Sequence, residues 1–404
     1  ICMSCQDLIK KMDMVRMCSQ RTTCILRCTG GEALNAFSIA TYEIDQKRGT
    51  DYYKRFNEFA KNFQENDLTA AQGMTDVRGD RSLKPHQQPD PDMYLRVVDE
   101  RSDGIVVRGA KAHISGAPVM HEIFVMPSRT MRKEDRDFAV AFVVPSDAKG
   151  LTHVVNTTFR EEGKEDDHPF SSKYSSAESF LFFDDVFIPE ERVFMCGEHE
   201  FSRRLVLAFS TPHRHSRLAC SSGITDILTG ASALAAEYNG IQNVSHIRDK
   251  INELLLMSES YYALGISAAT LASKTASGTY MPNILHTNVG KVMTARGLHE
   301  AIRLTQDVAG GLVQTVPSSK TYQNKALAER LDKYLKAKDT VPTQHRVRLF
   351  RFLQDLTTYG WAGFWLVVSA VGAGSPYGAK LIASREVDLE EKKKLIKRLC
   401  GIQE

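Results

Sequence analysis

Four residues of this chain carry side chains that suit a metal centre. Cys24 and Cys28 are four positions apart, a spacing that places two sulfurs on one face of a helix, and His213 is followed seven positions later by Cys220. Three thiolates and one imidazole suit zinc or an iron–sulfur cluster, because both accept soft sulfur together with one nitrogen. The alternative is two ordinary helical cysteines and a capped loop just ahead of a helix. From these residues alone both interpretations stay open.

Other cofactor signals are weak in the sequence. It contains neither a Walker loop nor a GxGxxG turn, and the pair Cys2 and Cys5 has no second half, so it is interpreted as ordinary thiols. Eight cysteines in 404 residues without a visible secretory signal indicate reduced thiols or metal ligands, and hence a cytoplasmic protein. The chain starts at Ile1 and not at methionine, which predicts a truncated beginning.

Three segments with different patterns of apolar residues must position these four residues. Apolar residues at helical spacing predict helices over residues 1–66, an incomplete helical domain. Residues 67–200 are expected to form a β domain of barrel or sandwich type, with strands near 94–98, 104–107, 123–126, 138–144 and 179–183. Residues 201–404 are expected to form a helical bundle, with helices near 224–238, 245–272, 288–308, 344–370 and 389–399. The predicted class is α+β.

Composition limits the choice of partners. Hydrophobic residues make up 42% of the chain and charged residues 25%, as in an ordinary globular protein. The balance of 52 Lys and Arg against 49 Asp and Glu gives a net charge of +3, too even for a nucleic-acid binder. The longest apolar stretch, residues 361–373, is shorter than the roughly 20 residues of a membrane span. We therefore expect no nucleic-acid partner and no membrane segment.

Several strings of the sequence resemble the 4-hydroxybutyryl-CoA dehydratase family. They are TYEIDQK at 41–47, QENDL at 64–68, MTD at 74–76, GDR at 79–81, GIVVRGAKAH at 104–113 and GAGSP at 372–376. The resemblance extends over essentially the whole chain, and the wider superfamily includes the flavin-dependent 4-hydroxyphenylacetate 3-hydroxylases. It implies the acyl-CoA dehydrogenase fold: N-terminal helices, a central β domain and a C-terminal helical bundle.

The resemblance also implies two cofactors. In the family a 4Fe–4S cluster is held by a CxxxC pair, a His, and a Cys seven residues later; the matching positions are Cys24, Cys28, His213 and Cys220. This favours iron–sulfur over zinc. FAD is implied between the β domain and the helices, with four residues near its ring: Thr75, Asp76, Ser115 and Gly116.

A homotetramer is implied as well, in which Gly310 and Gly311 meet the pyrophosphate of a neighbouring subunit's FAD. Glycine suits this place because backbone amides without a side chain approach phosphate closely. The alternative is that these two glycines only break a helix.

The implied activity is the anaerobic conversion of 4-hydroxybutyryl-CoA to crotonyl-CoA, together with isomerisation of vinylacetyl-CoA, by a radical mechanism. Iron would act as a Lewis acid for the leaving hydroxyl, with His213 as its replaceable ligand and a candidate base. Glu178 matches an acidic residue near the family's active site, although an ordinary surface Glu is the alternative.

The chain departs from the family around this site. Val368 and Val371 stand where the family has Glu and His, Arg217 where it has Tyr, and Ser221 where it has Lys. Each acid–base group raises a reaction rate by about 100- to 10,000-fold, so we expect the chain to keep isomerisation activity and to lose most dehydration activity. Arg217 is a fixed cation able to hold an anionic group, and a solvent-facing Arg is the alternative.

Two other functions stay open. One is a flavin-dependent aromatic (4-hydroxyphenylacetate) 3-monooxygenase, a class that lacks the ligand quartet and consumes oxygen. The other is a catalytically inactive paralogue in which a metal only ties the helical halves together, as the two valines suggest.

Overall fold

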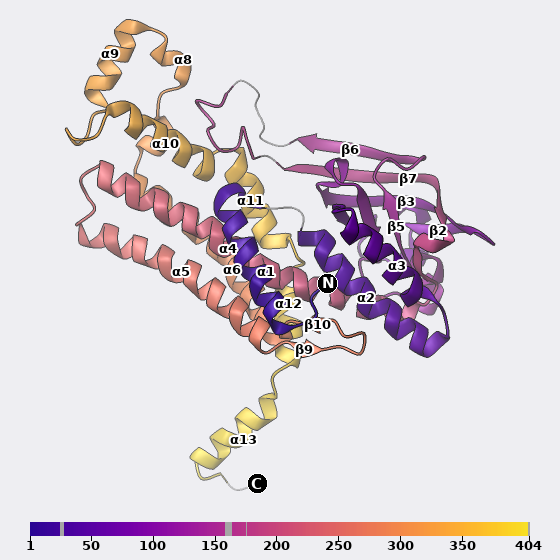
Figure 1. The fold of residues 1–404 in the computed structure, drawn as a ribbon. Helices are drawn as coiled ribbons and strands as arrows, with labels where there is room; N and C mark the ends of the chain where they lie inside the picture. Colours follow the sequence, from indigo (N-terminus) through magenta and orange to yellow (C-terminus); the bar gives the residue numbers. More distant parts are fainter. Residues whose placement is uncertain (25–27, 158–163, 175, 403–404) are drawn as a thin grey trace.

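The computed structural model describes residues 1–24, 28–157, 164–174 and 176–402 (Figure 1). Three helices open the chain, as the apolar spacing predicts: α1 (Cys5–Thr22), α2 (Cys28–Arg48) and α3 (Tyr52–Glu65). The Ser4 hydroxyl caps α1 by accepting from the amide of Asp7, and Thr23, at a φ of +64°, ends it. Helix α2 is buried along most of its length, so it forms the inner layer of the N-terminal helices.

Two four-stranded sheets form the β domain. The first has the order β1-β4-β5-β8, with β1 parallel to β4 and the other pairs antiparallel. Its strands are β1 (Ala70–Gly73), β4 (Glu122–Val125), β5 (Val140–Pro145) and β8 (Val193–Cys196). The second, antiparallel throughout, has the order β2-β3-β7-β6. Its strands are β2 (Arg96–Arg101), β3 (Gly104–Ser115), β6 (Leu151–Thr157) and β7 (Ala177–Pro189).

Apolar side chains of both sheets, among them Val107, Phe142 and Phe183, share one core, so the β domain is a sandwich. Each of the five predicted strands is present, with shifted ends. Strands β1, β6 and β8 were not predicted. Short 3₁₀ turns lie at Pro85–Gln87, Pro91–Met93, Ala117–Val119, Lys133–Phe138, Glu190–Arg192 and His199–Phe201.

Helices make up the C-terminal half. The long ones are α4 (Ser202–Tyr238), α5 (Ser245–Thr270) and α6 (Ile284–Ala309), which run side by side with α1 (Figure 1). A small ribbon, β9 (Ser273–Lys274) with β10 (Tyr280–Met281), joins α5 to α6. The remaining helices are α7 (Leu312–Thr315), α8 (Ser319–Tyr322), α9 (Lys325–Tyr334), α10 (Thr343–Thr357), α11 (Gly360–Val371), α12 (Pro376–Arg385) and α13 (Leu389–Leu399).

Two predicted helices have the wrong extent. The helix expected at 224–238 begins at Ser202, and Pro212 lies inside it. The polar run around Pro212 hides the apolar period, because this face of α4 is buried among polar groups. The helix expected at 344–370 is interrupted at Thr358 and Tyr359, between α10 and α11.

The N-terminal helices pack on the outer face of the first sheet. Phe37 of α2 makes an edge-to-face contact with Phe124 of β4 at 5.1 Å, and Phe56 of α3 belongs to the same core. A Cβ on Gly30 would lie 2.9 Å from the carbonyl oxygen of Ala70, so only glycine lets α2 approach β1 this closely. This approach fixes the start of α2 between the sandwich and the bundle.

The α+β architecture of helices, β domain and helices is confirmed, whereas the boundaries 1–66, 67–200 and 201–404 stay predictions. Two helical stretches of the described residues are long and apolar enough to cross a bilayer by length and composition, His199–Tyr238 and Thr343–Arg385. The most apolar window of the first is 67% buried and that of the second 11% buried. A core helix passes the same test, so the absence of a membrane span stays a prediction.

Candidate metal centre

Helix α4 presents His213 and Cys220 from its interior. Seven residues make about two turns, so both side chains lie on the same face of the helix. The expectation of a capped loop ahead of a helix is therefore wrong. A rigid, buried helix holds both groups.

Cys24 and Cys28 lie near the same site, just before and at the start of α2. Cys28 is the first residue of α2, Cys24 lies outside any helix, and residues 25–27 are outside the described part of the chain. The expectation that one helix face carries both sulfurs is wrong, because α1 ends at Thr23. The two thiols are nevertheless close neighbours: beyond burial and Glu32, the charges of Cys24 and Cys220 raise the pKa of Cys28.

A buried carboxylate that the sequence did not reveal completes the centre. The Cys28 sulfur, a Glu32 oxygen and a His213 ring nitrogen all lie within 4.8 Å of one another. Glu32 is fully buried; its Oε2 lies 2.7 Å from His213 Nδ1 and its Oε1 accepts from Lys11 Nζ at 3.0 Å. Because an ionised carboxylate only accepts, Nδ1 donates to Glu32, and Nε2 is the ring nitrogen that remains for a metal.

The charge states show why these groups need a cation. Burial opposes ionisation of Glu32, yet Lys11 and His213 hold its pKa below the ordinary value. Burial first, and then Glu32 and the neighbouring thiols, raise the pKa of Cys28 well above its ordinary value, and burial also raises the pKa of Cys220. Several half-buried thiols beside a buried carboxylate are unfavourable as anions unless a metal compensates their charge. The donor set therefore fits a metal centre, with Glu32 already engaged by Lys11 and His213.

Three buried basic residues lie close to one another, and two of them, Arg217 and Lys291, lie near Cys220. Arg214 and Arg217 belong to α4 and Lys291 to α6, and they are 5%, 6% and 0% exposed. Arg217 Nη1 lies 3.7 Å from the Cys220 sulfur, so Arg217 does not face solvent. Burial lowers the pKa of Arg214 to about 10, and burial together with Arg217 and Arg214 lowers that of Lys291 to about 7.

The residues expected near a flavin ring gather in the β domain. The Thr75 carbonyl accepts from Ala112, and Asp76 pairs with Lys111 at 2.6 Å. The second Asp76 oxygen accepts from Ser128 at 2.7 Å, so this carboxylate is already engaged in holding the loop after β1. The side chains of Asp76 and Lys111 are both almost fully buried, so their ion pair fixes the position of the loop after β1.

Glu178 is the second residue of β7 and lies directly opposite Ser115 of β3. Its oxygens accept from the hydroxyls of Ser115 at 2.7 Å and Ser176 at 3.0 Å, and Gly116 turns the chain next to them at a φ of +76°. Burial raises the Glu178 pKa above its ordinary value, although both hydroxyls oppose the shift. Glu178 is thus a partly buried carboxyl and not an ordinary surface one.

Gln72 of β1 supports a polar ligand at this domain. Its side chain is largely buried, and neither amide atom has a hydrogen-bonding partner among the described residues. A buried amide without partners is costly, and a flavin has the donors and acceptors to satisfy it. Gly310 and Gly311 lie elsewhere, at the end of α6, where Gly310 adopts a φ of +71° and ends the helix.

Val368 and Val371, the two valines of α11 that depart from the family pattern, lie in different environments. Val368 is half-buried against the apolar core of the bundle, and Val371 is 60% exposed. Their neighbours Ser369 and Ala370 accept hydrogen bonds from Lys291 Nζ at 2.8 and 3.3 Å. The buried lysine therefore faces backbone carbonyl groups of α11, next to the two valines.

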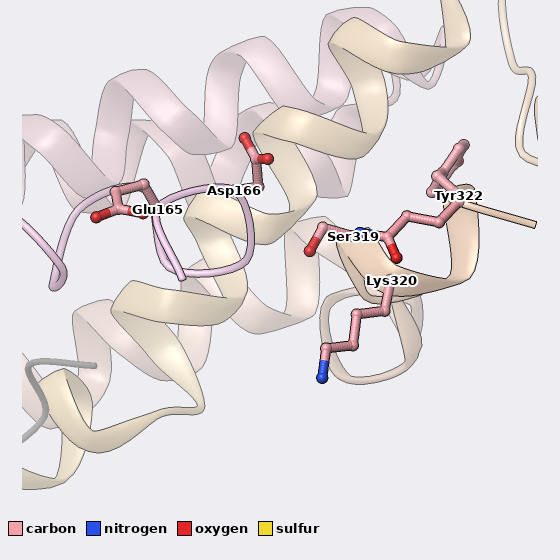
Figure 2. Close-up of a pocket in the computed structure, with 6 residues that line it drawn as sticks. Glu165, Asp166, Ser319, Lys320 and Tyr322 are labelled. Carbon is pink, nitrogen blue, oxygen red and sulfur yellow. The ribbon is translucent and has the colours of Figure 1, made fainter. Parts of the chain in front are cut away.

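A separate surface cleft of about 530 Å³ lies where the loop before β7 meets α8 (Figure 2). Its lining is polar and includes Glu165, Asp166, Ser319 and Lys320. None of the candidate site residues lines it, so it is distinct from the metal centre.

The arrangement of layers defines the class of protein. A β sandwich between N-terminal helices and a C-terminal bundle is the fold of the acyl-CoA dehydrogenases. A solved glutaryl-CoA dehydrogenase shares it with a TM-score of 0.52 at 15% identity, over 93% of this chain and 78% of its own.

The family follows from closer comparisons. The models for the N-terminal and C-terminal parts of 4-hydroxyphenylacetate 3-hydroxylase match residues 1–195 and 202–401. The 4-hydroxybutyryl-CoA dehydratase/vinylacetyl-CoA-Δ-isomerase of Clostridium aminobutyricum is 40% identical over 99% of this chain and 84% of its own length. The chain belongs to the 4-hydroxyphenylacetate 3-hydroxylase family and, within it, to the 4-hydroxybutyryl-CoA dehydratases, as the sequence resemblance indicates.

Two further relatives agree with this placement. The structure of an oxygen-tolerant archaeal 4-hydroxybutyryl-CoA dehydratase from N. maritimus superposes with a TM-score of 0.96 at 39% identity, covering 100% of this chain and 81% of that one. The oxygenase component of 4-hydroxyphenylacetate 3-monooxygenase from Thermus thermophilus is 30% identical over 77% of this chain and 65% of its own length. The monooxygenase relative is the more distant of the two.

Proposed function

We propose that this chain is an FAD- and 4Fe–4S-dependent enzyme of the 4-hydroxybutyryl-CoA dehydratase type that acts on an acyl-CoA, with isomerisation favoured over dehydration. The observation that carries the proposal is the convergence of Cys28, Cys220, Cys24 and His213 at one buried place. Residues far apart in the chain have no other evident reason to gather three thiols and an imidazole there.

The protein's own groups supply binding, orientation and proton control. Cys24, Cys28 and Cys220 would hold the cluster by sulfur, and His213 would hold the remaining corner by Nε2. Lys11 and Glu32 keep the His213 ring oriented through Nδ1, so that this weaker ligand can give way to a substrate oxygen. A cluster iron would supply Lewis acidity toward a leaving hydroxyl.

Glu178 and the loop after β1 would contact the bound FAD. FAD next to Gln72, Thr75 and Ser115 would satisfy the orphan amide of Gln72. Glu178, with a pKa raised above its ordinary value by burial, is a candidate to exchange a proton. A neighbouring copy of the chain would bring Gly310 and Gly311 to the pyrophosphate, in a homotetramer in the cytoplasm.

Val368 and Val371 motivate the bias toward isomerisation. Neither side chain can carry a proton, and the buried Lys291 beside them has no carboxylate partner among the described residues. Moving a double bond needs only a proton removed and returned, whereas water loss needs an additional acid for the hydroxyl. The step that lacks its acid is the one expected to fail.

The test is an anaerobic purification followed by three assays in parallel. We expect iron, sulfide and flavin in the purified protein, conversion of vinylacetyl-CoA to crotonyl-CoA, and little turnover of 4-hydroxybutyryl-CoA. Zinc without flavin would support the inactive paralogue, and oxygen-dependent hydroxylation of 4-hydroxyphenylacetate would support the monooxygenase. Efficient dehydration would contradict the argument from Val368.

A further inference from the structure

Three buried basic side chains near Cys220 have no carboxylate partner among the described residues. Arg214 donates to the Ala373 carbonyl at 3.0 Å and to Asn288 Oδ1 at 2.6 Å, and Lys291 donates only to backbone carbonyls. No carboxylate of the described residues forms an ion pair with Arg214, Arg217 or Lys291. Burying cations without counter-ions is unfavourable, so an anionic ligand at this place would be strongly favoured.

Arg217 has an open hydrogen-bonding edge. Its Nη1 faces the Cys220 sulfur, and its guanidinium lies 5.6 Å from the centre of the Trp365 ring. Its Nε and Nη2 atoms are buried and have no partner in the described part of the chain. These two atoms form the side of the guanidinium that presents two parallel N–H groups.

The same edge binds carboxylates elsewhere in this protein. Arg16 Nε and Nη2 donate to the two oxygens of Asp226 at 2.9 and 3.1 Å. Arg108 uses the same two atoms for Asp185 at 2.8 Å each. A planar pair of donors matches the two oxygens of a carboxylate far better than one carbonyl oxygen.

We infer that Arg217, with Lys291 beside it, binds a carboxylate on the acyl group of the substrate, so that the substrate class is the CoA thioester of a dicarboxylic acid. This inference rests on the proposed function, since it takes the acyl end to lie at the metal centre. The phosphates of CoA are separated from the thioester by the whole pantetheine arm. An anion next to Cys220 therefore belongs to the acyl group.

The experiment measures binding, not turnover. Succinyl-CoA and glutaryl-CoA are compared with butyryl-CoA by equilibrium dialysis against anaerobically purified protein. We expect at least one of the two dicarboxylic thioesters to bind about 10- to 100-fold more tightly than butyryl-CoA, the ratio typical of hydrogen bonds to a charged group. Arg217→Met should abolish this preference, and Arg217→Lys should keep part of it.

Arg303→Met is the matched control, because the same edge of Arg303 is already filled by Glu300 on the surface. It should leave all three affinities unchanged. Equal binding of the three thioesters to the unmodified protein would overturn the inference, and this comparison needs no variant to fold. The inference would also be overturned if Arg217→Met shifted the reduction potential of the cluster but kept the preference for dicarboxylic thioesters. Arg217 would then act only on the Cys220 sulfur. Missing iron and flavin would refute the proposed function, whereas the carboxylate preference is decided separately by the dialysis.

Discussion

Replacing Glu32 by Gln should separate the electrostatic support of the metal centre from its ligands. The substitution keeps the shape of the side chain and removes the charge between Lys11 and His213. Glu32 is fully buried, and the Lys11 side chain is only 13% exposed. Glu32→Gln therefore leaves a buried ammonium without its counter-ion.

The magnitude follows from this burial. Removing one partner of a buried ion pair costs about 3–5 kcal/mol of unfolding free energy. Removing the group that orients a metal-binding histidine weakens metal affinity by about 10- to 100-fold. The amide oxygen that the substitution introduces still accepts from Nδ1 of His213, so the lower end of that range is expected for the metal.

Two measurements check the prediction. Chemical denaturation of metal-free protein reports the stability loss, and the iron retained against a competing chelator reports the affinity. Glu259→Gln is the control, because Glu259 pairs with Arg16 on the surface and exposed pairs contribute at most about 1 kcal/mol. The double variant Lys11→Met with Glu32→Gln removes both charges and should recover much of the lost stability.

The reasoning would be refuted if Glu32→Gln matched the unmodified protein in both stability and iron retention. It would also be refuted if the double variant were less stable than Glu32→Gln alone, because Lys11 would then not be the uncompensated group. Loss of iron together with unchanged stability would show that Glu32 orients His213 without sustaining the fold.

Three other predictions concern single residues. Glu178→Gln should raise the melting temperature at pH 8 and leave it unchanged near pH 4. A carboxyl whose pKa is raised above 4.5 destabilises the fold only at pH values where it is ionised. A rise in melting temperature that does not depend on pH would contradict this prediction. Burial lowers the pKa of His215 from 6.5 to about 4, so about 3 kcal/mol of stability should be lost as the pH falls from 6.5 to 4, and denaturation of metal-free His215→Gln should show a smaller loss. Val368→Glu should raise the ratio of dehydration to isomerisation by about 100-fold in parallel assays if the missing acid is the cause, and an unchanged ratio would place the defect elsewhere.

Local pattern was enough to predict most of the fold. The apolar period of residues 1–66 and the β-rich runs after residue 67 specify the layers, because each reflects one buried face. The beginning of α4 was missed, since around Pro212 the helix buries serine, histidine and arginine instead of an apolar stripe. The break before Gly360 was missed because helical segments with buried apolar residues lie directly on both sides of it.

Sequence spacing singled out the candidate ligands but not their surroundings, and that these residues bind a metal stays a prediction. Spacing marks Cys24, Cys28, His213 and Cys220, but Glu32 lies in a helix that is buried almost all round, where no polar face distinguishes it. Its position one turn after Cys28 was the available signal. The free edge of Arg217 depends on which atoms its neighbours leave unpaired, and that is a property of the folded chain alone.

The wide separation of the ligands in the chain has a consequence for biosynthesis. Glu32 and His213 are 181 positions apart, and at roughly 5–20 residues per second a ribosome needs about 10 to 40 s to make that span. During this interval the nascent chain exposes Cys24 and Cys28 without their partners on α4. The proposed cluster could therefore be completed only after α4 has emerged and docked, and until then Cys24 and Cys28 would remain exposed thiols.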